Sequence, residues 1–173
     1  MKFLRVEKER YFFHLAHREK ALLEFLMRLY PVIPSAHQTL SKSSTPDESQ
    51  KLLNEALAEQ RRENKQLVDK LLNDDRRFQE TTKGIEMNLS AGEIEWVLQV
   101  LNDVRVGNWI LLGSPEEHPR FDPEAADAPY VVAMGLASNF QMDLLDAIKH
   151  QWIFHRRGAA APITDGRRLY FLR

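Results

Sequence analysis

A short polar cluster contains the residues whose types and spacing are best suited to chemistry. Asn102, Asp103 and Arg105 follow the apolar run of a predicted helix, and Trp109 comes four residues after Arg105. On a helix, Asn102, Arg105 and Trp109 lie in one row, because residues three or four positions apart are neighbours. A guanidinium between an amide and an indole could bind an anion or a peptide. This row is therefore a candidate ligand-binding pocket.

Arg105 also has a structural interpretation. It continues the row of Leu98 and Leu101, so it should lie at the edge of the buried face of its helix. A partly buried guanidinium needs a carboxylate or carbonyl partner. Asp143 or Asp146, on a later predicted helix, could supply it. We expect such an internal salt bridge, which would fix helix packing, rather than a ligand pocket.

A metal site is a weaker candidate. Asp143, Asp146 and His150 stand at positions i, i+3 and i+7 of one helix, and two carboxylates with an imidazole could hold a divalent cation. Because this row lies away from the apolar face of the helix, we expect a solvated surface instead. The spacing of His14 and His17 matches no zinc motif. We therefore predict neither a metal nor another cofactor.

Catalytic motifs are absent from the sequence. There is no cysteine, and no glycine-rich phosphate loop, nucleophile elbow or kinase motif occurs. Ser90 is explained as a helix cap, so it is not needed as a nucleophile. These absences favour a protein that is not an enzyme.

The charge balance argues against nucleic-acid binding as the main function. Lys and Arg number 24, Asp and Glu number 25, and the formal net charge is −1. A nucleic-acid-binding module that uses the C-terminal arginines remains an alternative, because few acidic residues oppose them. The chain holds four arginine pairs, namely Arg61-Arg62, Arg76-Arg77, Arg156-Arg157 and Arg167-Arg168.

The polar cluster must be positioned by the helix that precedes it, predicted over residues 89–109. Ser90 is a good N-cap, and Glu93 stands three residues later to complete a capping box. Apolar residues then recur at helical spacing, at Ile94, Val97, Leu98, Leu101 and Val104. This is the clearest helix in the sequence.

Two elements precede a long predicted arm. Residues 3–6 and 11–15 suit the strands of an antiparallel hairpin, and residues 18–30 form an amphipathic helix that ends at prolines. Residues 35–45 are polar and should form a loop.

Residues 46–83 are predicted to form the arm, with helical character up to residue 81. Its seam has alternate spacings of four and three, at Leu53, Leu57, Gln60, Asn64, Leu67, Leu71, Asp74 and Phe78. Because the middle of the seam is polar, either the helix breaks near residues 61–64, or it is continuous and the polar residues set the register of a partner helix.

The C-terminal third completes a predicted single domain of 173 residues. Residues 114–129 are a proline-rich loop, and residues 130–154 form a last helix. Its apolar face is Ala133, Ala137, Phe140, Leu144, Ile148 and Trp152. Asp165-Gly166 then predicts a second hairpin. We expect a mostly α, α+β fold, in which three to four antiparallel helices pack as a bundle and strands from both termini form one small antiparallel sheet.

The run Leu101-Asn102-Asp103-Val104-Arg105 resembles, as a distant branch, the uncharacterised bacterial family named domain of unknown function two thousand and seventeen. The resemblance also rests on the charged hairpin that leads into a helix, on the LS-x-x-E start before this run, and on the closing helix over residues 131–148. Residues 106–109 depart from the family's more regular continuation. The resemblance implies no catalytic residues. Because genes of this family tend to lie near the small adaptor of the Clp protease, it implies a regulatory or proteolysis-linked role.

The favoured function is a non-enzymatic interaction or regulatory protein. The heptad-like arm over residues 46–81 suggests a protein partner or self-association, with a homodimer as one form. The alternative is a ligand-binding protein or enzyme with a pocket at Asn102, Arg105 and Trp109. No signal peptide or membrane-spanning run is apparent, so we expect a cytoplasmic location.

Overall fold

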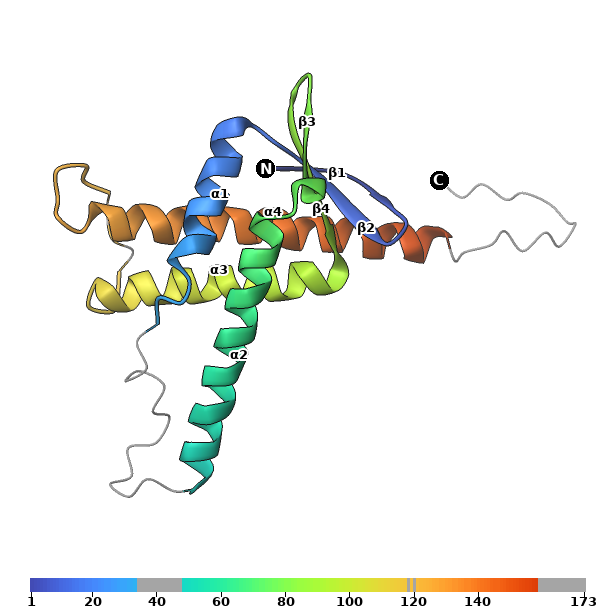
Figure 1. The fold of residues 1–173 in the computed structure, drawn as a ribbon. Helices are drawn as coiled ribbons and strands as arrows, with labels where there is room; N and C mark the ends of the chain where they lie inside the picture. The colour runs from blue at the N-terminus through green and yellow to red at the C-terminus, as the bar shows by residue number, and fades with distance from the viewer. Residues whose placement is uncertain (34–47, 118, 120, 159–173) are drawn as a thin grey trace, which may run out of the picture.

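The computed structural model describes residues 1–33, 48–117, 119 and 121–158, and within them four α-helices and a four-stranded antiparallel sheet form an α+β fold (Figure 1). The predicted fold class is confirmed at this level. In chain order the elements are β1 (Lys2–Glu7), β2 (Arg10–Leu15), α1 (His17–Leu29), α2 (Glu48–Leu72), the 3-10 helix η2 (Asp75–Arg77), β3 (Phe78–Thr81), β4 (Gly84–Ser90), α3 (Ala91–Leu111) and α4 (Ala128–Gly158).

The predicted N-terminal hairpin is confirmed as β1 and β2, which pair antiparallel. Its turn places both Lys8 and Glu9 at positive φ, 48° and 62°, as the tight turns that match the twist of a hairpin require. Along β2 the side chains alternate between buried and half-buried, since successive residues of a strand point to opposite faces. Tyr11, Phe13 and Leu15 therefore enter the core.

The remaining strands come from the middle of the chain, where we predicted none. The sheet has the order β1-β2-β4-β3, so β4 lies between the N-terminal hairpin and β3. Ile85, Met87 and Leu89 of β4 are buried and alternate with polar residues, a period of two that marks a strand. The strands predicted near the C-terminus, over residues 163–173, lie outside the described residues.

The predicted arm over residues 46–83 is too long, because α2 is a single unbroken helix that ends at Leu72. Asp74 accepts the N–H of Arg76 at 3.2 Å and turns the chain into η2. Phe78–Thr81 then pairs with β4, so ladder hydrogen bonds replace the helix there. Asp74 and Phe78, which we placed on the helical seam, lie outside the helix.

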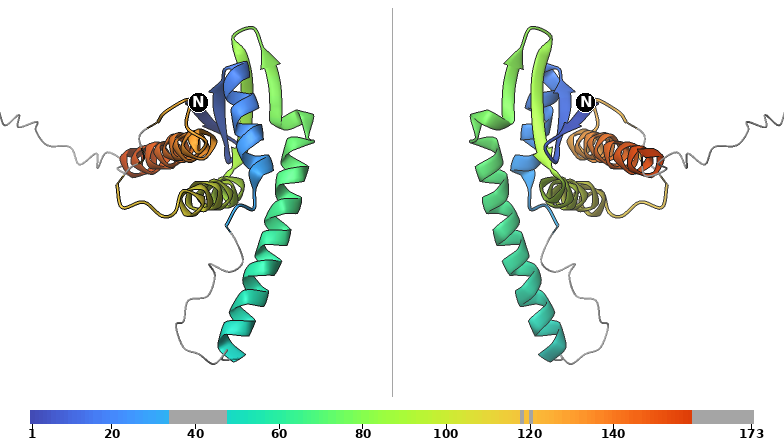
Figure 2. Two further views of the ribbon diagram at one scale, coloured as in Figure 1. Left: turned by 90° about the vertical axis from the view of Figure 1, so that its left-hand side faces the viewer. Right: turned by 90° about the vertical axis from the view of Figure 1, so that its right-hand side faces the viewer.

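Helices α3 and α4 lie side by side and run in opposite directions, with the sheet and α1 packed on one side of the pair (Figures 1 and 2). Helices α1 and α2 cross this pair steeply, so the four helices do not line up as the antiparallel bundle that we predicted (Figure 1). The N-terminal half of α2 extends away from the other elements (Figures 1 and 2).

The core forms where β2 and β4 meet α1, α3 and α4. Its largest fully buried side chains include Phe13, Leu15, Leu26, Met87, Ile94, Leu101 and Leu144. Each contributes about 1.5–3 kcal/mol by leaving water. The predicted apolar face of α4 is confirmed from Ala133 to Leu144, Ile148 packs at its edge, and the Trp152 side chain lies outside the described residues. Within the described residues, no helix is both long and apolar enough to cross a membrane.

Candidate functional site

Asp103 of α3 holds the segment that leaves α1. Its side chain is only 10% exposed, and its Oδ1 accepts the N–H groups of Val32 and Ile33 at 2.6 and 3.2 Å. Arg61 of α2 reaches Oδ2 at 3.4 Å. One buried carboxylate therefore ties the end of α1, the middle of α2 and α3 together. The sequence indicated a polar cluster here, but it did not predict that Asp103 would be buried and bind the backbone of another segment.

Gly107, one turn further along α3, makes room for the same segment. A Cβ at this position would lie 2.5 Å from the Cβ of Val32 and 2.9 Å from the nitrogen of Ile33, distances that real atoms do not reach. A helical glycine costs about 1 kcal/mol relative to alanine, so this one is explained by the close approach. Asp103 and Gly107 lie four residues apart on one side of α3, and together they dock the segment.

A groove runs between α2 and α3, with a volume of about 360 Å³. We call it the α2–α3 groove. Its walls combine aliphatic side chains with side-chain amides, while its two charged groups, Arg61 and Asp103, contact each other. The lining residues are Tyr30, Ile33, Leu57, Gln60, Arg61, Asn64, Gln99, Asn102, Asp103, Val106 and Ile110.

Amide groups connect the two helices across this groove. Gln99 of α3 accepts hydrogen bonds from Gln60 at 3.1 Å and from Asn64 at 3.4 Å. Asn64 is 7% exposed and lies near the phenol of Tyr30, whose pKa is raised by burial. The polar middle of the α2 seam had two explanations, a break in the helix or a continuous helix that contacts a partner helix. The helix is continuous. The helix that these residues contact is α3 of the same chain.

Arg105 and Trp109 line a second hollow of about 270 Å³, on the side of α3 that faces α4. Arg105 donates to Oδ1 of Asn102 at 2.9 Å, and Trp109 donates its Nε1 hydrogen to the Pro115 carbonyl at 3.2 Å. Trp109 is 39% exposed. The three predicted site residues are thus neighbours, but Asn102 lines the α2–α3 groove while the other two line this Arg105–Trp109 hollow. Its lining is Arg105, Val106, Trp109, Pro115, Glu116, Glu117, Pro119 and Met134.

The salt bridge that we expected for Arg105 is not among the ion pairs of the described residues. Asp143 lies 3.1 Å from the amino group of Met1, and Asp146 lies 3.1 Å from Lys149. Both carboxylates point elsewhere, since α4 packs on α3 through its apolar face. Arg105 is left half-buried at the mouth of its hollow.

The same two aspartates do not form a metal site with the groups that the structure describes. Each is engaged by a cation, as above, and the side chain of His150 lies outside the described residues. In the described part of the chain, no group of three or more His, Asp or Glu side chains could hold a metal ion.

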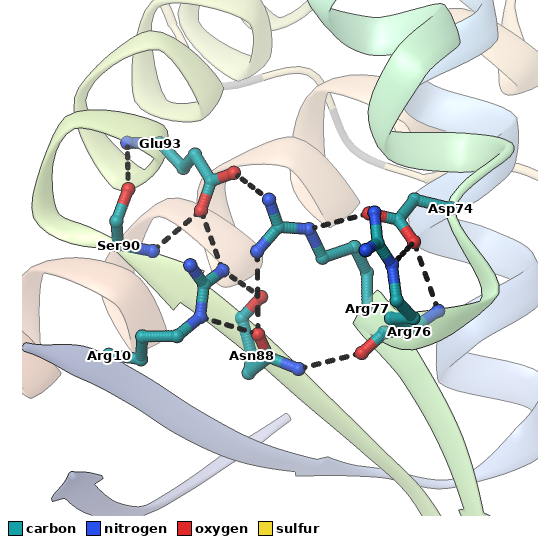
Figure 3. A network of polar contacts seen from close by, with 7 residues as sticks. All are labelled: Arg10, Asp74, Arg76, Arg77, Asn88, Ser90 and Glu93. Carbon is teal, nitrogen blue, oxygen red and sulfur yellow. Dashed lines mark hydrogen bonds and ion pairs between the residues drawn. The ribbon is translucent and has the colours of Figure 1, made fainter. Parts of the chain in front are cut away.

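Glu93, at the start of α3, is the centre of a polar network (Figure 3). It completes the predicted capping box, because Ser90 accepts the Glu93 N–H at 3.2 Å and Glu93 accepts the Ser90 N–H at 2.7 Å. The same carboxylate pairs with Arg10 of β2 at 2.9 Å and with Arg77 of η2 at 2.7 Å. The capping box was predicted, whereas the two arginines were not assigned to it.

Asn88 and Asp74 complete this network (Figure 3), and both line a hollow of about 290 Å³. Asn88 accepts from Nε of Arg10 at 2.7 Å and donates to the Arg76 carbonyl at 3.0 Å. Asp74 pairs with Arg76 at 2.8 Å and with Arg77 at 3.2 Å. The arginines that line the hollow thus have carboxylate partners from the chain itself, so this network is a structural clamp between the sheet and α3.

Another hollow, of about 440 Å³, separates α1 from β3. Lys20 of α1 lies there, paired with Glu24 and placed 5.1 Å from the ring centre of Phe78. These contacts satisfy the ammonium group and attach α1 to β3. We therefore interpret this hollow as the seam between two packed elements.

Compared with protein-family models, with curated proteins and with solved structures, the chain matches none. The α2–α3 groove contains no serine, lysine or histidine among its lining residues, and its one carboxylate already accepts hydrogen bonds from Val32 and Ile33. Its aliphatic, phenol and amide groups offer a bound molecule both apolar contacts and neutral hydrogen-bonding partners.

Proposed function

We propose that this chain is a non-enzymatic interaction protein, and that a partner protein docks along the N-terminal half of α2 and in the α2–α3 groove. The observation that carries the proposal is that the N-terminal half of α2 extends from the body (Figure 1) and carries an exposed leucine beside the groove. Leu52 is 66% exposed, and Leu53 and Leu57 are half-buried beside it. Leucines at helical spacing next to a groove are the features by which helices and grooves recognise each other.

The charge of the α2–α3 groove limits which kinds of partner segment it can attract. Arg61 and Asp103 pair with each other, so the groove has no uncompensated charge to attract a strongly acidic or basic segment. Gln60, Gln99 and Asn102 offer neutral donors and acceptors. We therefore expect an amphipathic segment that presents apolar side chains, with polar groups that hydrogen-bond to these amides.

The test replaces Leu52 by Glu. It then compares the proteins that the Leu52→Glu variant and the wild-type chain each capture from a lysate of the native host. Phe121→Glu is the matched control, because Phe121 is also exposed, at 58%, but lies outside α2. A protein retained by the wild type and Phe121→Glu, and lost with Leu52→Glu, supports the proposal. Titration of that purified protein should then show binding about 10-fold weaker for Leu52→Glu, a change of about 1.4 kcal/mol. Equal capture by all three chains contradicts it.

The resemblance described above adds a regulatory, proteolysis-linked role to this proposal. The identity of the captured protein tests that addition. A protease, or an adaptor that delivers substrates to one, supports it. A partner without any connection to protein turnover leaves the interaction proposal intact and removes the regulatory part.

A second candidate is a ligand pocket in the Arg105–Trp109 hollow. It is favoured because a half-buried guanidinium and a 39% exposed indole line the same hollow. Such a pair would take a small anion with an apolar or aromatic part. Nucleic-acid binding through Arg156, Arg157, Arg167 and Arg168 has no comparable support, since those side chains lie outside the described residues.

A further inference from the structure

Helix α4 has two seams, and among the described residues only the inner one packs fully into the core. The inner seam packs on α3 and the sheet and is fully buried. The outer seam lies on the opposite side of the helix. Met142 is 61% and Leu145 is 45% exposed there, Gly135 and Lys149 are also exposed, and Val131 and Ser138 are half-buried. Its residues follow alternate spacings of four and three, at Val131, Gly135, Ser138, Met142, Leu145 and Lys149.

The outer seam lacks the charges that a solvent-facing helix normally has. From Ala128 to Met142 the chain contains no Asp, Glu, Lys or Arg, although the outer side of this stretch faces solvent. Gly135 adds a second unexplained feature. A Cβ at this position would have no atom within 4 Å, so nothing within the described chain requires a glycine that costs about 1 kcal/mol in a helix.

We propose that the outer seam of α4 pairs with the same seam of a second copy of this chain, antiparallel about a two-fold axis. The reason is the order of side-chain sizes along the seam. Gly135 and Ser138 are small and come first, whereas Met142 and Leu145 are large and follow. With the axis near residue 140, Leu145 faces Gly135 of the second copy and Met142 faces Ser138 of the second copy. A two-fold contact requires such self-complementarity.

A parallel arrangement does not provide the same fit. It would place Met142 against Met142 and leave Gly135 against Gly135, with crowding at one end and a gap at the other. The charges agree with the antiparallel choice. Lys149, which also pairs with Asp146 of its own helix, comes level with Val131 of the second copy and about one helical turn from Asp127 there, so opposite charges approach at both ends of the seam.

This inference goes beyond the proposed function, because it concerns a different surface and a different occupant. The α2–α3 groove receives a partner protein, whereas α4 receives a second copy of the chain. Replacing Leu52 by Glu should therefore leave the dimer intact, and failure of either proposal does not decide the other.

The first experiment is a disulfide cross-link, which is simple because the chain has no cysteine. Gly135→Cys and Leu145→Cys are prepared separately, mixed under reducing conditions and then oxidised. In the antiparallel pair, positions 135 and 145 are opposite, while two copies of position 135 are separated by about 15 Å along the axis. A disulfide needs Cα atoms within about 7 Å. We expect a covalent dimer, twice the 20.2 kDa chain mass, only in the mixture.

Other cross-linking results contradict the proposal. A disulfide between two Gly135→Cys chains would show a parallel pair. Absence of a cross-link in the mixture would show that these seams do not meet, whatever the oligomeric state.

The second experiment measures molar mass by light scattering over a range of concentrations. Met142→Glu places a carboxylate against an apolar surface, which is costly when it is buried without a partner. We expect the dissociation constant of the dimer to rise at least about 100-fold. Leu52→Glu is the control and should not change it. A monomeric wild type, or a dimer that Met142→Glu leaves unchanged, overturns the proposal, and circular dichroism checks that the variant remains folded.

Discussion

At the scale of single residues, the polar cluster of α3 divides into an inward and an outward part. Asp103 points inward and binds the backbone after α1, whereas Asn102 and Arg105 point outward and bind each other. Residue types and spacing could not separate these roles, because the partner of Asp103 is 70 residues away in the sequence. The residue of the cluster that is tied to the architecture is therefore Asp103, which was not one of the three predicted pocket residues.

We predict that Asp103→Ala lowers the free energy of unfolding by about 2–4 kcal/mol. The N–H groups of Val32 and Ile33 would lose their acceptor, and a buried unpaired donor costs about 1–3 kcal/mol. Asp103→Asn keeps one acceptor oxygen and should cost less. The measurement is urea denaturation followed by circular dichroism. Asn102→Ala is the exposed control, expected within about 0.5 kcal/mol of the wild type, and an equal loss for both alanine variants would contradict the role of Asp103.

We predict that the contact between Arg5 and Glu86 makes the free energy of unfolding depend on pH. Its carboxylate accepts two hydrogen bonds from Arg5, at 2.8 and 3.1 Å, and these lower the pKa of Glu86 below its ordinary value. Because the pKa is lower in the folded than in the unfolded chain, the contact stabilises the fold above the unfolded pKa of about 4.3. That stabilisation is lost as the pH falls through the folded pKa.

The variant Glu86→Gln tests this dependence. The difference in free energy of unfolding between the wild type and Glu86→Gln should be larger near neutral pH than at about pH 2.5, because protonation of Glu86 in acid weakens its contact with Arg5. Urea denaturation at the two pH values gives the comparison. A difference that does not change with pH would show that Arg5 and Glu86 are not coupled in solution.

At the scale of elements, α3 is positioned by its first turn. Ser90 and Glu93 satisfy the free N–H groups at the helix start, and Glu93 also receives Arg10 from β2 and Arg77 from η2. The start of the helix is thus attached to two neighbouring elements. This attachment sets where the polar cluster, three turns later, meets α2 and the end of α1.

We predict that Ser90→Ala costs about 1 kcal/mol of stability, the usual value of an N-cap. Glu93→Ala should cost more, about 2–3 kcal/mol, because it removes the cap partner and leaves two arginines without their carboxylate. Thermal or urea denaturation of both variants gives the comparison. Equal losses would mean that the arginine contacts contribute nothing beyond the cap.

Elements differ in how far the sequence predicts them. The N-terminal hairpin, α1 and α3 follow from apolar periodicity and end signals, which are local. The end of α2 does not, because residues 78–81 have few local breakers and become a strand only by pairing with β4. The alternation of Ile85, Met87 and Leu89 was the available signal for that strand.

At the scale of the whole molecule, the two proposed surfaces belong to different elements. Helices α2 and α4 lie on opposite sides of the body (Figure 2). A dimer formed through α4 would therefore keep both α2 helices accessible to partners. This separation is why Leu52→Glu and Met142→Glu can each serve as the control for the other surface.

Sequence alone determined the features that depend on near neighbours. These are the capping box of α3, the N-terminal hairpin, the inner face of α4 and the absence of cysteine chemistry. Tertiary structure decided which distant segments meet: β4 lies beside β2, Gln60 and Asn64 meet Gln99, and Asp103 receives the backbone at Val32. The physical reason is that caps and periodicity act within a few residues, whereas the choice of a partner depends on burying all the apolar faces at once.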